Sequence, residues 1–332
     1  MAEYKGVMVY CEVAEGKLAA IATELLGCGR KLADALGQEL CAVLVGSEVS
    51  SLAQEVITFG ADKVYVIDEP LLKDYQTDSY VLAMEKLTKQ VMPQILILGQ
   101  TSIGRDLAPR LAFKLGTIAS MDCVELAIDS DSKRLLQTKP VFGGNALAIF
   151  TSESNPQIAT VRAKAMSPLE PDASRQGEVI TVDAGIEPSA IRTNVLEKVP
   201  EEVEGIKLED AKVVVGGGRG IGDAEGFKQL EELAKILRGA VGATRPPCDN
   251  GWVPAGLQIG LTGKIITPDL YIAVALSGSS QHMTGTSGAK TIIAINKDAE
   301  ANIFREARFG IVGDWKKVLP AFTDKVKGLL AE

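Results

Sequence analysis

The residue with the most distinctive chemistry in this chain is His282, the only histidine among 332 residues. It follows an apolar run, residues 270–276, and a glycine- and serine-rich turn, residues 277–281. This pattern is typical of a buried strand, a turn and the start of a helix, and the amides and hydroxyls of such turns bind phosphate. A single histidine excludes a metal site built from two or three histidines. The simpler alternative is that His282 makes one structural hydrogen bond.

Two other turns contain arginines suited to anions. Residues 216–222 are glycine-rich and include Arg219, whose guanidinium can pair with phosphate. Their glycines do not follow the GxGxxG spacing. Arg245 follows Thr244 and precedes two prolines that restrict the backbone. The simpler alternatives are a tight turn for the first and a surface ion pair for the second.

Three further polar residues stand where a nucleotide site would need them. Thr262 lies between two glycines, in a run that lacks the Walker A pattern. Asn296 and Asp314 follow apolar runs, and open α/β sheets bind ligands at the carboxyl ends of their strands. The simpler alternative for each of the three is a turn residue or a helix cap. No nucleophile–base pair is apparent, and Ser277 lacks the GxSxG elbow. The sequence therefore favours a dinucleotide site without catalytic residues or metal.

Composition narrows the function classes. The net charge of -8 argues against a nucleic-acid partner, which requires a basic surface. The five cysteines are widely spaced, which excludes iron–sulfur, zinc and disulfide frameworks and favours a reducing compartment. The chain contains no apolar stretch of 18 residues and no leader pattern. We therefore expect a cytoplasmic protein without stable membrane association.

The distribution of apolar residues predicts two α/β domains. The first half alternates strand and helix patterns, which predicts a parallel sheet with right-handed crossovers. Residues 121–165 predict short strands that close this sheet with antiparallel or mixed edge pieces, and 166–205 is rich in Pro, Glu and Ser and ends in a linker. The expected domains are 1–205, with a mixed sheet, and 206–332, with a parallel sheet. The expected elements are 6–13, 17–36, 40–46, 49–59, 63–67, 79–91, 94–99, 103–115, 212–215, 226–237, 240–243, 270–276, 291–295 and 311–312.

The order of the turns resembles the electron transfer flavoprotein alpha subunit. The resemblance covers the whole second domain and extends into the first. The residues that carry it are 217–220, 242–245, 260–264, 268–273, 277–282, 294–298 and 302–304, with 139–146 and 160–162 in the first domain.

This resemblance implies an FAD in the second domain. The implied diphosphate contacts are Arg219 and the turn at Ser277, and Asn296 and Asp314 lie toward the adenosine end. The full implied set is Arg219, Thr244, Arg245, Ile259, Gly260, Leu261, Thr262, Ser277, Gly278, Ser279, Ser280, Gln281, His282, Asn296, Asp314 and Trp315.

At the flavin end, the resemblance implies that Arg245 lies against the isoalloxazine and that Thr262 reaches N5. Gln281 and His282 face the pyrimidine edge, with His282 near N1 and O2. Positive charge at this edge stabilises an anionic semiquinone, and a unit charge 4 Å away is worth roughly 4 kcal/mol at an effective dielectric near 20. We therefore expect Arg245 to dominate this stabilisation and His282 to add to it.

The resemblance also implies a heterodimer with a beta subunit. Such a dimer carries single electrons between acyl-CoA-type or other flavin dehydrogenases and an acceptor, as a redox carrier rather than as an enzyme by itself. Leu261 stands where many respiratory members carry Gln. This difference resembles the versions of strict anaerobes, whose NADH-reactive beta subunit holds a second FAD and bifurcates electrons. A swing of the flavin domain on a linker near 200–210 is also expected.

A second hypothesis belongs to another class. The turn at residues 100–105 would serve a stand-alone nucleotide-binding enzyme or sensor. The simpler interpretation is that this turn is a helix N-terminus that packs against the partner subunit.

Overall fold

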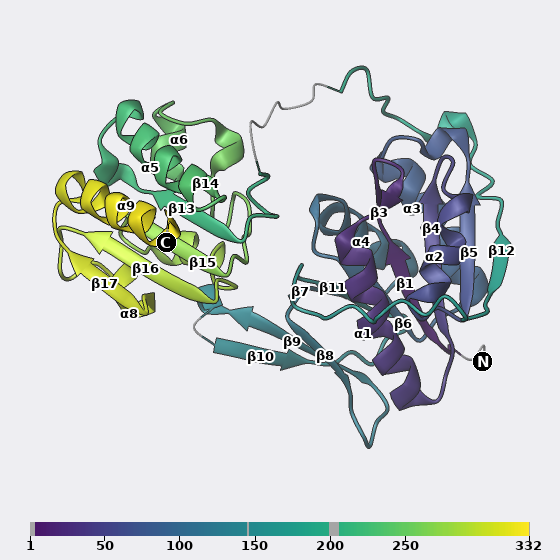
Figure 1. Ribbon diagram of the computed structural model, residues 1–332. Coiled ribbons are helices and arrows are strands. Elements are labelled where there is room, and N and C mark those ends of the chain that lie inside the picture. Colours follow the sequence, from purple (N-terminus) through teal and green to yellow (C-terminus); the bar gives the residue numbers. More distant parts are fainter. Residues whose placement is uncertain (1–3, 145, 199–205, 332) are drawn as a thin grey trace. The chain divides into compact units, whose positions relative to one another are not determined.

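The computed structural model describes residues 4–144, 146–198 and 206–331 (Figure 1). Its contacts divide the chain into two compact units. Unit 1 comprises Met1–Val141 and Leu147–Val199, and unit 2 comprises Phe142–Ala146 and Pro200–Glu332. The expected end of the linker falls on residues 199–205, outside the described residues, so the boundary between 205 and 206 stays a prediction.

Unit 1 is built on a seven-stranded sheet whose reported pairings are all parallel. Its strands β1, β4, β6 and β11 are buried throughout, as expected for a parallel sheet covered on both faces. In order across the sheet, the strands are β12 (Glu178–Thr181), β5 (Lys63–Asp68), β4 (Leu40–Gly46), β1 (Val7–Cys11), β6 (Ile95–Gly99), β11 (Gln157–Val161) and β7 (Ala119–Cys123).

Helices cover both faces of this sheet. Successive residues of β1 point to opposite faces, so Val9 packs in the core that contains α1 and α2, and Met8 packs in the core that contains α3 and α4. The helices are α1 (Ala20–Leu36), α2 (Ala53–Thr58), α3 (Thr77–Val91) and α4 (Ser102–Leu115). A small hairpin, β2 (Val13–Ala14) and β3 (Lys17–Leu18), lies between β1 and α1. The predicted elements of the first half are thus confirmed, except that residues 17–18 form a strand.

The prediction that the short strands of residues 121–165 close the first sheet is wrong in one respect. The strands β8 (Glu125–Ile128), β9 (Leu135–Val141) and β10 (Ala146–Phe150) form a sheet of their own, in the order β10-β9-β8. The chain leaves the first sheet after β7, where Asp122 adopts a positive φ of 64°. It returns as β11, which enters parallel to β6 and β7. The segment that forms the three-stranded sheet therefore returns the chain to the amino-terminal edge of the first sheet, where a parallel strand must start.

Sequence reasoning missed β12, which lies in the Pro-, Glu- and Ser-rich segment. This strand has only four residues and is mostly exposed, so it shows no clear periodicity. It pairs with β5 in parallel, from Glu178 opposite Lys63 to Thr181 opposite Val66. Tertiary contacts, rather than local propensity, therefore recruit this segment to the sheet.

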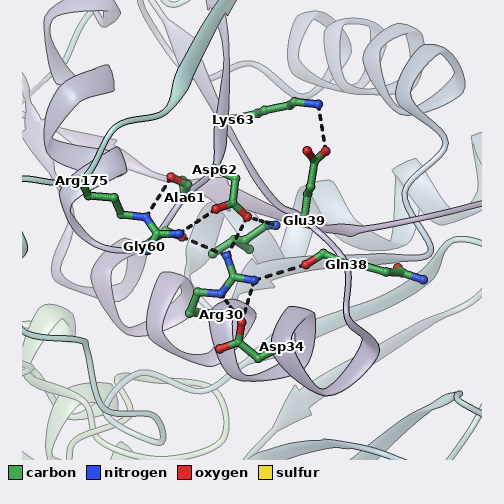
Figure 2. Close-up of polar contacts among 10 residues, drawn as sticks. Arg30, Asp34, Gln38, Glu39, Gly60, Ala61, Asp62, Lys63 and Arg175 are labelled. Carbon is green, nitrogen blue, oxygen red and sulfur yellow. Dashed lines mark hydrogen bonds and ion pairs between the residues drawn. The ribbon is translucent and has the colours of Figure 1, made fainter.

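One such contact is a network around Asp62, at the amino ends of β4 and β5 (Figure 2). The carboxylate accepts a hydrogen bond from the Leu40 amide at 2.9 Å, and it pairs with Arg30 and Arg175 at 2.7 Å each. Arg30 extends from α1, and Arg175 lies three residues before the start of β12. Charge-assisted hydrogen bonds of this kind are worth about 1.5–3 kcal/mol each when protected from solvent. The network thus ties a helix, two strand starts and the returning segment together.

Unit 2 contains a five-stranded sheet whose reported pairings are parallel. In order, its strands are β14 (Ala240–Ala243), β13 (Val213–Gly217), β15 (Leu270–Val274), β16 (Thr291–Asn296) and β17 (Phe309–Val312). Its helices are α5 (Ala224–Ile236), α6 (Arg245–Asp249), α7 (Ser280–Thr284), α8 (Ile303–Glu306) and α9 (Trp315–Ala331). The predicted strands and α5 are confirmed, whereas α9 was missed, with Pro320 inside it.

No helix in the described ranges is both long and apolar enough to cross a membrane.

Candidate functional site

The candidate site lies at the carboxyl edge of the sheet in unit 2. The chain passes from β13 to β14 on one side and later to β15 on the other, so the strand order reverses between β13 and β15. Ligands of open α/β sheets bind at such switch points, outside the carboxyl ends of the strands. Gly218 and Arg219 follow β13, and Ala275 follows β15. The turns singled out in the sequence therefore share one edge.

Close backbone packing explains why two of these turns contain glycine. A Cβ atom on Gly218 would lie 2.4 Å from the Ala275 carbonyl oxygen. A Cβ atom on Gly278 would lie 2.4 Å from the Ile303 amide nitrogen, and this residue has a φ of 73°. Ala275 itself adopts a φ of 51°, which costs a non-glycine residue about 1–2 kcal/mol. The turns that end β13 and β15 are thus held in a conformation that only specific residues permit.

A cavity of about 140 Å³ lies beside the turns. Its lining combines apolar surface from Pro246, Ile259 and Leu261 with polar side chains, a combination suited to a planar aromatic group that carries hydrogen-bonding atoms. Of the residues expected from the sequence, it brings together Thr244, Arg245, Ile259, Gly260, Leu261, Thr262, Ser279, Gln281 and His282.

Arg245 supplies the positive charge of this cavity. It begins α6, its side chain is 66% exposed, and its Nε lies 3.2 Å from a carboxylate oxygen of Asp249 one turn later. An exposed pair of this kind is worth at most about 1 kcal/mol, so Asp249 restrains Arg245 only weakly. Arg245 can therefore exchange this partner for an anionic ligand.

His282 is buried, with 4% of its surface exposed. Its Nδ1 lies 3.1 Å from the Ile259 carbonyl oxygen, and its Nε2 lies 2.8 Å from the Tyr271 hydroxyl. Burial lowers the pKa of His282 to about 4, although the hydrogen bond to Ile259 opposes this shift. At neutral pH the imidazole is therefore uncharged. The contribution of His282 beside Arg245 stays a prediction, and a neutral ring would make it through its dipole and not through a charge, because a buried ring without a carboxylate partner stays neutral.

Thr262 is exposed and lies in the loop that closes the cavity. The Gln258 side-chain amide donates a hydrogen bond of 2.9 Å to its Oγ1, which leaves the threonine proton available to a ligand. Gln258, Tyr271 and Asp249 were missed as site residues. Gln258 and Asp249 stand four positions from Thr262 and Arg245, and only this spacing pointed to them. No signal in the sequence pairs Tyr271 with His282.

The remaining expected residues lie outside this cavity. Arg219 and Ser277 are exposed at the ends of β13 and β15. Gly278 and Ser280 line a different cavity, together with Met283 and Asn302.

Three of the expected residues have structural contacts of their own. Asn296 is buried and donates to the Leu276 carbonyl at 2.8 Å, and Asp314 accepts from the Lys316 amide at the start of α9. Trp315 is buried, and its Nε1 donates to the Gly220 carbonyl at 3.0 Å, so its indole supports the turn that carries Arg219.

The turn at residues 100–105 in unit 1 differs from the turns of the candidate site in unit 2. Thr101 caps α4 by accepting from the Gly104 amide, and it donates to a carboxylate oxygen of Glu12 at 2.7 Å. Glu12 is buried at the end of β1, 6% exposed. The side chain of Thr101 is thus engaged within the protein, and the ionised form of Glu12 would repel a phosphate at this helix N-terminus. This arrangement disfavours the hypothesis of a stand-alone nucleotide-binding enzyme or sensor.

Within the described residues, no group of His, Cys, Asp and Glu side chains is placed to hold a metal ion. The five cysteines form no disulfide, and all except Cys248 are buried.

Comparisons with known proteins show the family of this chain. Residues 7–187 match the family described as the electron transfer flavoprotein domain, and residues 207–287 match the electron transfer flavoprotein FAD-binding domain. The chain is 46% identical to the electron transfer flavoprotein subunit alpha of Thermoanaerobacterium thermosaccharolyticum, over 99% of this chain and 100% of that protein. It is 45% identical to the same subunit of Megasphaera elsdenii, over 98% of both chains, and 40% identical to that of Bacillus subtilis, also over 98% of both. The chain therefore belongs to the electron transfer flavoprotein alpha family, an electron-transfer subunit family whose cofactor is FAD and whose members pair with a beta subunit.

Proposed function

We propose that this chain holds FAD at the carboxyl edge of the sheet in unit 2 and, paired with a beta subunit, passes single electrons between dehydrogenases and an acceptor. The observation that carries the proposal is the cavity beside the β13–β15 switch point, which joins an exposed arginine to apolar and hydroxyl-bearing side chains. The chain has no catalytic residue in this proposal, because its role is to bind and orient a redox group.

The residues present fit FAD. The glycine turns after β13 and β15 keep side chains away from the edge, as the approach of a diphosphate requires. The cavity beside them has apolar walls for a planar ring, and Thr262 offers a hydroxyl proton. Bound FAD would supply the one- and two-electron chemistry that no side chain here can supply.

In this proposal the cofactor spans the edge of the sheet. Arg219 and the turn of Ser277, Gly278, Ser279 and Ser280 bind the diphosphate. Asn296, Asp314 and Trp315 hold the adenosine end, with Asn296 and Trp315 acting through the loops that they brace.

At the other end, Arg245, Thr244, Thr262 and Gln281 surround the isoalloxazine, and the loop of Ile259, Gly260 and Leu261 covers it. The positive charge of Arg245 favours electron density on the ring. His282, being neutral, contributes a dipole rather than a charge.

A beta subunit, acyl-CoA-type or other flavin dehydrogenases and an acceptor are the proposed partners. An NADH-reactive beta subunit with a second FAD, as in electron bifurcation and anaerobic metabolism, is the proposed subclass, and Leu261 beside the cavity is its sequence support. We propose a cytoplasmic location because the five cysteines are free thiols, typical of a reducing compartment. A swing of unit 2 between partners is part of the proposal.

The first test is the absorbance spectrum of the purified heterodimer. We expect flavin absorbance at neutral pH, and a heterodimer without it would refute the proposal. Titration with NADH then tests the subclass: two reducible flavins per heterodimer support bifurcation, and one flavin that NADH does not reduce excludes it.

The role of Arg245 is tested by Arg245→Ala. A unit charge is worth roughly 4 kcal/mol at 4 Å and an effective dielectric near 20, and solvent exposure reduces this to about 1–2 kcal/mol. For one electron this corresponds to about 45–90 mV, because tenfold in an equilibrium constant is about 59 mV. We expect the potential of the first electron to fall by this amount. The matched variant Asp249→Asn removes the counter-ion of Arg245 and should raise the potential by a smaller amount. Equal potentials in wild type and Arg245→Ala would contradict the role.

A further inference from the structure

Tyr271 occupies an unusual place beneath the cavity. It lies in β15, in the centre of the five-stranded sheet, and is fully buried. Its hydroxyl reaches past the neighbouring strand β13, where a Cβ atom on Gly216 would lie 2.1 Å from it. Glycine at position 216 therefore leaves the space that this hydroxyl needs. The hydroxyl is 2.8 Å from Nε2 of His282.

The two partners of His282 determine where its proton resides. The Ile259 carbonyl oxygen can only accept, so Nδ1, at 3.1 Å, must carry a proton. In the neutral ring Nε2 is then an acceptor, and the Tyr271 hydroxyl must donate to it. Both nitrogens of the imidazole are thus engaged within the protein. A buried acceptor that loses its donor is unfavourable, so each partner holds the ring in this state.

The same ring holds the loop that closes the cavity. Ile259 belongs to the loop of residues 259–264, and α7 carries His282. The Leu261 amide also donates to the Gln281 carbonyl at 2.8 Å, on the same short helix. Since Leu261 and Thr262 face the cavity from this loop, the hydrogen bonds of His282 and Gln281 set the position of that wall.

We propose that Tyr271 is a positioning residue for the flavin pocket: its hydroxyl holds His282 as the neutral, Nδ1-protonated imidazole, and His282 in turn holds the 259–264 loop against α7. His282, which itself lines the cavity, then also sets the position of the loop that forms one wall of it. The identity of the ligand as a flavin rests on the proposed function, whereas the hydrogen-bonding state of His282 does not.

The test uses the full heterodimer, with the alpha chain labelled with ¹⁵N-histidine and the beta subunit unlabelled. Because His282 is the only histidine of this chain, both ring nitrogen resonances belong to it, and their couplings to the ring protons Hδ2 and Hε1 distinguish Nδ1 from Nε2. At pH 7 we expect one protonated nitrogen, Nδ1, and one unprotonated nitrogen with the shift of a hydrogen-bond acceptor. In Tyr271→Phe the Nε2 resonance should move to the position of an unprotonated nitrogen without a donor. The dissociation constant of FAD should rise about tenfold, the equivalent of about 1.4 kcal/mol.

The matched control is Tyr80→Phe. Tyr80 is also buried, and its hydroxyl donates to the Leu72 carbonyl at 2.9 Å in unit 1. It should leave the resonances of His282 and the FAD dissociation constant unchanged. A positioning role is thereby separated from a general loss of stability.

Three results overturn the proposal: a protonated Nε2 or a charged ring in the wild type at pH 7, an unchanged Nε2 resonance in Tyr271→Phe, or equal effects of the two phenylalanine variants. If Tyr271→Phe does not assemble, the wild-type spectrum decides by itself. A heterodimer that lacks flavin but shows the expected imidazole would refute the proposed function and leave the state of His282 standing.

Discussion

The carboxyl edges of the two parallel sheets have the same topology and opposite chemistry. In unit 1 the strand order reverses between β1 and β6, and in unit 2 it reverses between β13 and β15. The first edge is filled by Glu12, which accepts a hydrogen bond from Thr101. The second carries exposed Arg219 and Arg245 beside a cavity. The topology of a switch point therefore permits ligand binding but does not require it. The side chains at the strand ends determine whether a ligand can bind.

A glycine on the open edge gives the largest expected effect. Gly278→Ala places a Cβ atom 2.4 Å from the Ile303 backbone and forces alanine into a φ of 73°. We expect a loss of about 2–5 kcal/mol in the free energy of unfolding, from overpacking of about 1–3 and backbone strain of about 1–2 kcal/mol. Denaturant titration followed by Trp fluorescence measures it.

The control for this variant is Gly251→Ala. Gly251 has a similar φ of 69° but nothing within 4 Å of the added Cβ atom, so only the backbone strain of about 1–2 kcal/mol should remain. Equal losses in the two variants would show that the close packing of the turn does not matter, and the account of the open edge would fail.

The carboxyl edge of the sheet in unit 1, where Glu12 lies, is tested by Glu12→Gln. Burial raises the pKa of Glu12 to about 7 from 4.5, although the hydrogen bond from Thr101 opposes the shift. The stability that this residue contributes is therefore fully present below pH 4.5 and is lost as the pH rises through 7. At pH 8 the substitution should stabilise the protein by up to about 3 kcal/mol, because one pKa unit is worth 1.36 kcal/mol. The free energy of unfolding at pH 4 should change little.

Urea titrations between pH 4 and 8 measure this difference, with the exposed Glu55→Gln as the control. Part of the pH dependence should persist in the variant, because burial also raises the pKa of Glu24 to about 7, against the hydrogen bond from the Lys164 amide. An unchanged profile in Glu12→Gln would contradict the view that a buried carboxylate closes this edge.

The smallest of the three effects concerns the opposite end of the first sheet. Burial raises the pKa of Asp62, but the hydrogen bonds from Leu40 and Arg30 outweigh it and lower the net pKa. The stability that depends on the carboxylate is present above its ordinary pKa of 3.8 and is lost as the pH falls through the lowered value. Asp62→Asn should cost about 1–2 kcal/mol at pH 7, with partial exposure reducing the full value of the ion pairs.

Hydrogen exchange of the amides in β12 reports on the network directly, because Arg175 precedes that strand. The control is Asp34→Asn: Asp34 is 66% exposed in its pair with Arg30 and should contribute less than about 0.5 kcal/mol. Faster exchange in β12 after Asp34→Asn than after Asp62→Asn would show that Asp62 is not the anchor of this segment.

The sequence predicted elements that stand between clear turn signals, but it missed the edge strand β12 and the 17-residue helix α9. Residues 40–46 and 240–243 agree with β4 and β14 to the residue, because apolar runs between turn signals leave few alternatives. In contrast, β12 has four mostly exposed residues, and only its pairing with β5 defines it. At the site, the glycine and arginine turns were visible in the sequence, whereas Gln258 and Asp249 were indicated only by a four-residue spacing and Tyr271 by nothing.

The sequence alone determined the fold class, the family and the turns proposed to face the cofactor, because these depend on local patterns and on their order along the chain. Tertiary structure decided three things. It closed the first edge through Glu12 and Thr101, which are 89 positions apart. It placed Tyr271 against His282, and it buried that ring, which lowers its pKa to about 4. Charge state and hydrogen-bond direction depend on burial and on partners from other strands, which a linear pattern does not contain.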